Sequence, residues 1–234
     1  MGERPEATEA ADGPITDSRN QTPGTPGPSA TLLRDTGRVE AFSDGVFAVA
    51  ATLLVLNLQP PPVDAAHPLT TMLWDMRGKL VAYLISFGFI LIMWINHHNM
   101  FRVIRGTDHI FLLLNGLLLL LVTLVPFTTA LLTSYPATSH AESTAAAVYS
   151  ANYFVIALAY NFMWWYATWH GRLLNAELDV AAVHSINRRY LLGPLSYLAC
   201  VALAFVSVPA SLALNVALAI FYAWPYQARR PWRD

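Results

Sequence analysis

Charged side chains are scarce in this sequence. Only 12% of its 234 residues are charged and 55% are hydrophobic, whereas roughly 25% of the residues in a soluble domain are charged. This shortage indicates an integral membrane protein. The formal net charge is −1 and no basic patch is interleaved with aromatic residues, so a general nucleic-acid binder is excluded.

Cysteine is nearly absent as well. The one cysteine, Cys200, lies in an apolar run, which excludes a disulfide framework and a cysteine metal site. We expect it to be a small buried apolar side chain. The sequence also has no nucleophile–base pair, no paired catalytic carboxylates, no phosphate loop and no HExxH motif. We therefore expect no enzyme, no cofactor and no metal site.

Large apolar residues are almost missing from the start of the chain. Residues 1–31 mix Pro, Gly, Ser and Thr with charges of both signs, and such a segment cannot bury a core. We predict a disordered N-terminal tail over 1–31, a transmembrane domain over 32–228 and a basic cytoplasmic C-terminal tail over 229–234.

Uncharged runs predict an all-α membrane protein with six transmembrane helices, each near the ~20 residues that a bilayer requires. The last run is too long for one helix and is divided near Ser207. Pro126 is expected to kink the third span. A weak apolar stripe in 171–189 predicts a short interfacial helix. The six predicted spans are 39–58, 80–95, 110–132, 149–169, 190–208 and 211–226.

The positions of Lys and Arg predict the orientation. On one side of the membrane, Arg residues precede the first span, follow the second and fourth spans and lie in the C-terminal tail. The other side receives only Arg77 and Lys79. Cytoplasmic segments of membrane proteins are enriched in Lys and Arg. We therefore expect a multi-pass protein of the cell membrane with both termini in the cytoplasm.

The first span contains an acidic residue, Asp44. A carboxylate in hydrocarbon costs at least ~2.5–3.5 kcal/mol, so we expect Asp44 to have a donor as partner. At 100° per residue, Val49, Leu53 and Leu56 form one stripe and Asp44 lies on roughly the opposite face. Two interpretations of the stripe remain open. It faces lipid or neighbouring helices, or it meets copies from other subunits and constricts a pore.

Other polar residues lie inside the predicted spans. His97 and His98 are adjacent and point about 100° apart on a helix, which favours a hydrogen bond to another helix for one of them over a shared metal site. Four asparagines are predicted to form hydrogen bonds between helices, namely Asn115, Asn152, Asn161 and Asn215.

The first span begins with a motif that carries a resemblance. Arg38-x-x-x-Phe42-Ser43-Asp44-Gly45 resembles the RxxxFSDG signature of the transmembrane-protein-175 family of potassium channels, and Trp94-x-x-His97-His98 resembles the second span of its prokaryotic members. The resemblance implies a homotetramer in the lipid bilayer that passes potassium and other monovalent cations, with the first span lining the pore.

The resemblance also assigns roles to residues. It implies that Val49, Leu53 and Leu56 form the pore constriction and that Thr52 contributes to potassium selectivity. It further implies a structural network that packs the first helix against its neighbours, made of Arg38, Phe42, Ser43, Asp44, Gly45, His97 and His98. Val49 is smaller than the Leu or Ile usual in the layer nearest the cytoplasm, so we expect weak selectivity over sodium.

Two alternatives remain open at this point. A secondary transporter of a cation or small solute would use Asp44 as its ionisable group. A structural or assembly protein would have no transport of its own. No span carries a series of Arg residues, so a voltage sensor is not expected.

Overall fold

The computed structural model describes residues 36–61, 68–135, 140–169, 173–174 and 180–223 together with Gly2, with the backbone alone at 180–186 and 188–189. Apart from Gly2, the predicted tails 1–31 and 229–234 lie outside the described residues. The regular elements within these ranges are helices, joined by turns and short irregular segments, and an isolated β-bridge links Ile104 and Leu174. The all-α prediction is therefore confirmed.

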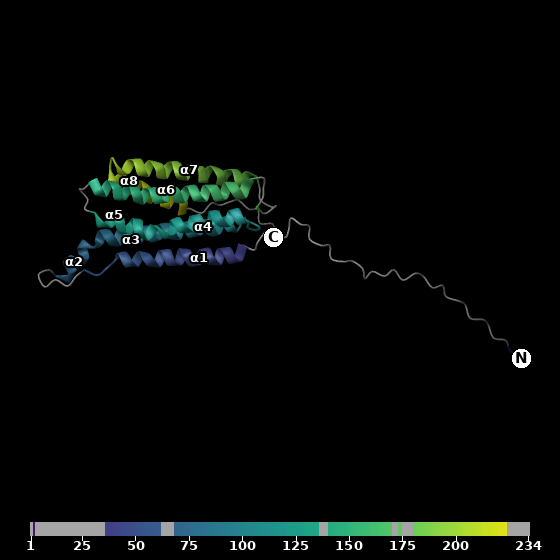
Figure 1. Ribbon diagram of the computed structural model, residues 1–234, viewed down its shortest axis with the longest axis horizontal. Coiled ribbons are helices and arrows are strands. Elements are labelled where there is room, and N and C mark those ends of the chain that lie inside the picture. The colour runs from purple at the N-terminus through teal and green to yellow at the C-terminus, as the bar shows by residue number, and fades with distance from the viewer. Residues whose placement is uncertain are drawn as a thin grey trace. The chain divides into compact units, whose positions relative to one another are not determined.

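The helices lie side by side along a common direction (Figure 1). The first helix, α1, continues into a short 3-10 segment, η1, and a break at Leu124 separates α4 from α5. The bounds are α1 Thr36–Leu53, η1 Leu54–Asn57, α2 Leu69–Asp75, α3 Arg77–Phe101, α4 His109–Thr123, α5 Val125–Ser134, α6 His140–Thr168, α7 Val180–Ala204 and α8 Val208–Ala223.

Three helical stretches are long and apolar enough to cross a membrane. They are Thr36–Asn57, Arg77–Phe101 and His109–Ser134, while Tyr190–Ala204 and α8 are shorter apolar helices. The 29 residues of α6 exceed the ~20 that a span requires. The protein is thus a membrane protein, and the count of six spans stays a prediction.

Two helices extend beyond the spans predicted for them. The second, 80–95, corresponds to α3, which runs from Arg77 to Phe101, so the helix continues through the polar run that follows the predicted span. Its His97 is buried because the bundle supplies a partner. The fourth, 149–169, corresponds to α6, which begins at His140. Alanines in that first part favour helix despite Glu142.

Where the structure describes it, the segment 171–189, predicted to contain a short interfacial helix, does not form a separate helix. The backbone from Val180 onward belongs to α7 and continues without a break to Ala204, while 175–179 lie outside the described residues. The break between the last two helices falls at 205–207, close to the predicted position. Pro126 stands in the first turn of α5, where its missing N–H removes no helical hydrogen bond.

Helix α6 is central, because it packs against α4, α5, α7 and α8. Two buried polar clusters tie it to its neighbours. Thr129 Oγ1 donates to Ser86 Oγ at 2.8 Å, and Ser86 Oγ lies 3.2 Å from the Tyr149 hydroxyl, which joins α5, α3 and α6. Asn215 Nδ2 of α8 donates to Ser150 Oγ of α6 at 2.9 Å.

The asparagine predictions are confirmed at three of four positions. Asn115 donates to Ser43, Asn215 donates to Ser150, and Asn161 donates to the carbonyl oxygen of Tyr190 at 2.7 Å. The Nδ2 of buried Asn152 has no partner among the described residues. Cys200 is buried, as expected.

Candidate functional site

One face of α1 is packed into the bundle. Ser43, Phe47 and Ala50 of α1 and Leu54 of η1 are buried, and their spacing of four, three and four residues places them on one side of the helix. This side contacts α3, α4 and α5. At its far end, Asn57 Nδ2 donates to the carbonyl oxygen of Pro126 at 3.0 Å.

A chain of buried hydrogen bonds holds this face. Ser43 Oγ donates to the carbonyl of Val39 at 2.8 Å and accepts from Asn115 Nδ2 at 3.0 Å. Asn115 Oδ1 and His97 Nε2 are 2.9 Å apart, and His97 must be the donor because an amide oxygen only accepts. The imidazole also stacks on Phe101 at 4.5 Å between ring centroids. These hydrogen bonds join α1, α4 and α3.

Asp44 has a donor as partner. Its Oδ1 accepts a hydrogen bond from Trp94 Nε1 of α3 at 2.8 Å, and the Trp94 ring stacks on His98 at 6.1 Å between centroids. Asp44 is nevertheless exposed on the surface of a single chain. The contact therefore connects α1 to α3 beside the buried hydrogen bonds of Ser43 and leaves part of the Asp44 carboxylate accessible.

The other residues of the first motif lie outside these contacts. Arg38 and Gly45 are exposed and Phe42 is 67% exposed. Among the described residues, no hydrogen bond or ion pair brings Arg38 to Ser43 or Asp44. The structure thus brings together Ser43, Asp44, His97 and, through Trp94, His98. The sequence motif does not identify Trp94 as the partner of Asp44, although it stands one helical turn before His97.

The aliphatic stripe of α1 faces away from the bundle. Val49 is 55% exposed, Leu53 41% and Leu56 64%. Thr52 is exposed, and its Oγ1 donates to the carbonyl of Val49 at 2.9 Å. In a single chain, therefore, the described residues leave much of the side of α1 that carries these four residues exposed. Within the described part of the chain, no three His, Cys, Asp or Glu residues are placed to hold a metal ion.

Comparisons with known proteins identify the family. The model of the family described as endosomal/lysosomal potassium channel TMEM175 matches residues 38–126. A Chamaesiphon minutus protein named potassium channel is 44% identical over 191 residues, which are 81% of this chain and 94% of that protein. A Streptomyces collinus protein named potassium channel is 41% identical over 192 residues, or 82% and 93% of the two chains. The chain belongs to the TMEM175 family.

Solved structures agree with this assignment. The crystal structure of a lysosomal potassium-selective channel TMEM175 homolog from Chamaesiphon minutus matches with a TM-score of 0.73 and 42% identity, covering 80% of this chain and 96% of the other. A crystal structure of the potassium channel MtTMEM175 matches with a TM-score of 0.55 and 20% identity, covering 82% and 90%. The second match shows a shared fold.

The substitution Asn115→Ala tests the buried hydrogen bonds that join Ser43, Asn115 and His97. The substitution leaves buried His97 Nε2 without its partner and removes the donor to Ser43 Oγ, which keeps only its bond to the carbonyl of Val39. We therefore expect the free energy of unfolding to fall by about 1–2 kcal/mol. Thermal unfolding of the purified protein in detergent measures the loss. The matched control is Asn99→Ala, because Asn99 is exposed near the end of α3 and its loss is expected to change stability little. Equal destabilisation by the two variants would contradict the role given to Asn115.

Proposed function

We propose that this protein is a potassium-permeable cation channel whose pore is lined by α1 from each of four identical subunits. The observation that carries the proposal is the division of α1 into two faces. One face is fixed by buried contacts with α3 and α4, and the other presents Val49, Leu53 and Leu56 outward. Membership in a family whose bacterial relatives are named potassium channels supports the same function.

The exposed face has the chemistry of a hydrophobic constriction. Four copies of Val49, Leu53 and Leu56 would form aliphatic rings, and rings of this kind gate by excluding water from a narrow neck. The exposed Thr52 hydroxyl donates its hydrogen to the carbonyl of Val49, which leaves the lone pairs of its oxygen available to a cation. The small Val49 side chain favours a wide inner layer and weak selectivity for potassium over sodium.

The arrangement of the helices supports six spans. The six rods are α1 with η1, α3, α4 with α5, α6, α7 and α8, and they alternate in direction along the chain (Figure 1). Arg38 near the start of α1 and Arg102 and Arg105 after α3 then lie at one end of the bundle, whereas Arg77 and Lys79 at the start of α3 lie at the other. By the positive-inside rule the first end is cytoplasmic, with both termini there and the protein in the cell membrane.

Asp44 acts as an anchor of α1 in this proposal. A carrier that used Asp44 would have to protonate its carboxylate or bind a cation there during each cycle. The carboxylate already accepts the Trp94 indole N–H, so its hydrogen bond holds the helix in place. Membership in a channel family likewise favours a channel over a carrier or an enzyme.

Recording from the purified protein in planar bilayers tests the proposal. In a potassium chloride gradient we expect single-channel currents whose reversal potential shifts toward the potassium equilibrium potential. The mass of the purified oligomer, measured on the same preparation, is expected to correspond to four chains. A folded tetramer that passes no current would refute the proposed function.

Val49→Ala and Val55→Ala form a matched pair for the constriction. Both remove the same two methyl groups from residues that are 55% and 51% exposed, but Val55 lies on the side of Asp44. We expect Val49→Ala to raise single-channel conductance or lower the potassium-to-sodium permeability ratio by roughly twofold or more, and Leu53→Ala to act in the same direction. Val55→Ala is expected to leave both quantities unchanged. Equal effects at Val49 and Val55 would remove Val49 from the constriction.

Asp44→Asn separates the anchor from a carrier. Asparagine keeps an Oδ1 acceptor for Trp94 and removes the charge, so potassium currents are expected to stay within about twofold of wild type. Asp44→Ala, which removes the acceptor as well, is expected to lower thermal stability. Proton-coupled uptake that Asp44→Asn abolishes in liposomes, with the oligomer intact, would favour the carrier instead.

A further inference from the structure

An apolar groove runs between α3 and α8 on the outside of the bundle. Its volume is about 350 Å³, and it is lined by Leu84, Ile85, Gly88 and Ile92 of α3 and by Val216, Ala219, Ile220 and Ala223 of α8. Gly88 leaves the groove open, since a Cβ added there would meet no atom within 4 Å. A groove without polar groups does not hold ordered water. Its ligand must itself be apolar.

The groove lies at the depth of the hydrocarbon layer. α3 is one of the stretches able to cross a membrane and begins at Arg77. The groove residues 84–92 therefore lie roughly 10–23 Å along the helix axis from Arg77, at 1.5 Å per residue. The hydrocarbon core of a bilayer is about 30 Å thick. The acyl chain of a lipid whose headgroup lies near Arg77 therefore reaches the groove.

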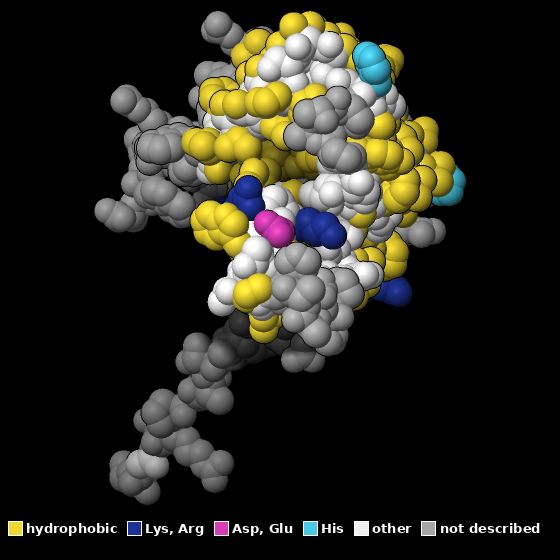
Figure 2. Space-filling view, turned by 90° about the vertical axis from the view of Figure 1, so that its left-hand side faces the viewer, with side chains coloured by type: hydrophobic (Ala, Val, Ile, Leu, Met, Phe, Trp, Pro, Cys, Tyr) yellow, Lys and Arg dark blue, Asp and Glu magenta, His cyan; other side chains and the backbone are white. Residues whose placement is uncertain are grey.

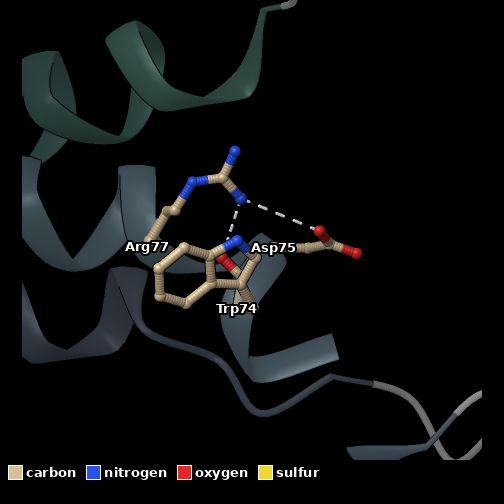
Figure 3. Close-up of polar contacts among 3 residues, drawn as sticks. All are labelled: Trp74, Asp75 and Arg77. Atoms are coloured by element: carbon tan, nitrogen blue, oxygen red, sulfur yellow. Dashed lines mark hydrogen bonds and ion pairs between the residues drawn. The ribbon is translucent and has the colours of Figure 1, made fainter. Parts of the chain in front are cut away.

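The junction of α2 and α3 has the residues of a membrane boundary. α2 buries none of its side chains, and Leu69, Leu73 and Trp74 are 62%, 54% and 69% exposed. The Arg77 guanidinium lies 5.3 Å from the centroid of the Trp74 ring (Figure 3). Figure 2 shows basic and acidic side chains among apolar ones at this end of the bundle. Trp and Arg in such positions are typical of the headgroup level.

Arg77 stands above the groove on the same face of α3. Arg77, Val81, Leu84, Gly88 and Ile92 are spaced by four, three, four and four residues, which keeps them within about 80° of one another around the helix. The side chain of Arg77 is 60% exposed. The face thus presents a cation at the headgroup level and an apolar channel below it.

The guanidinium keeps donors for a second ligand. Nη1 donates to the carbonyl of Trp74 at 3.0 Å and lies 3.8 Å from the Asp75 carboxylate (Figure 3). The other terminal nitrogen points away from both partners (Figure 3). Asp75 is 72% exposed, and an exposed pair at this distance is weak. Arg binds phosphate through several N–H groups at once.

From this geometry we propose that the groove between α3 and α8 binds one acyl chain of a phospholipid whose phosphate is bound by Arg77. The charge at the rim matches the phosphate, and the groove begins roughly 10 Å from Arg77 along α3, within the layer that acyl chains fill. The site is separate from α1, and it exists whether or not the protein conducts ions.

Photolabelling in a bilayer tests the site. The full protein is reconstituted with a phospholipid that carries a diazirine in one acyl chain, irradiated and mapped by mass spectrometry of its peptides. We expect label on 84–92 and 216–223 to exceed label on α4. Its Leu113 and Leu120 are 62% and 59% exposed, similar to Leu84 in the groove at 58%, but they do not line this groove. Gly88→Phe is expected to remove most of the groove label.

Two control variants separate the site from general effects. Gly116→Phe on α4 is the matched control for Gly88→Phe, because a Cβ at Gly116 also meets nothing within 4 Å, and it is expected to leave the groove label unchanged. Arg77→Gln is expected to lower that label about two- to fivefold, the range of an exposed charge pair. Lys79→Gln, on the opposite side of α3, is expected to have no effect.

Two results would overturn the proposal. Equal labelling of the groove and α4 would mean ordinary boundary lipid without a site. An unlabelled groove, together with loss of the oligomer on Gly88→Phe but not on Gly116→Phe, would mean that a second copy of the chain fills it. The mass of the oligomer in each variant distinguishes these outcomes, and ion currents are not needed for either.

Discussion

The hydrogen-bonded chain from Ser43 through Asn115 to His97 is the interaction on which the position of α1 depends. In a bilayer, apolar faces of helices gain little by leaving lipid, so side-chain hydrogen bonds and close packing select the neighbours of a helix. Ser43, His97 and Asn115 are 0%, 1% and 3% exposed, and neither water nor lipid replaces their contacts. Because α1 is apolar on most sides, this chain decides which side turns inward.

Clusters of buried, hydrogen-bonded side chains also join the other helices of the bundle. One cluster joins α1, α3 and α4, a second around Ser86 joins α3, α5 and α6, and a third around Asn215 joins α6 to α8. In the third, Ser211 Oγ of α8 also donates to the carbonyl of Cys200 in α7 at 2.7 Å. Neighbouring clusters share a helix, first α3 and then α6. Three small polar clusters inside an apolar bundle thereby link the helices to one another.

Much of this fold could be predicted from the sequence, because uncharged runs and prolines have direct structural consequences. The helical class, the break beside Pro126, the expectation that Asp44 pairs with a donor and the contacts of three asparagines follow from local features of the sequence, whereas the identity of the donor, Trp94, does not. The ends of α3 and α6 do not. His97 and Asn99 are both polar residues near the end of an apolar run, and nothing in the sequence shows which of them is buried. His97 is buried because Asn115 of α4 lies within hydrogen-bond distance of it. Periodicity groups Val49 with Leu53, but it cannot tell that Phe47 and Ala50, equally apolar, form the buried side.

An exposed apolar stripe has less meaning in a bilayer than in water, since lipid covers it at little cost. The proposed pore therefore depends on the register of α1 relative to its neighbouring helices. Ser43 and Asp44 are both held by neighbouring helices, so every copy of α1 presents the same residues at the same height. A slip of one residue would replace Val49 by Ala48 or Ala50 and remove a ring of branched side chains. The contacts at the start of α1 thus determine the width of the proposed constriction several residues away.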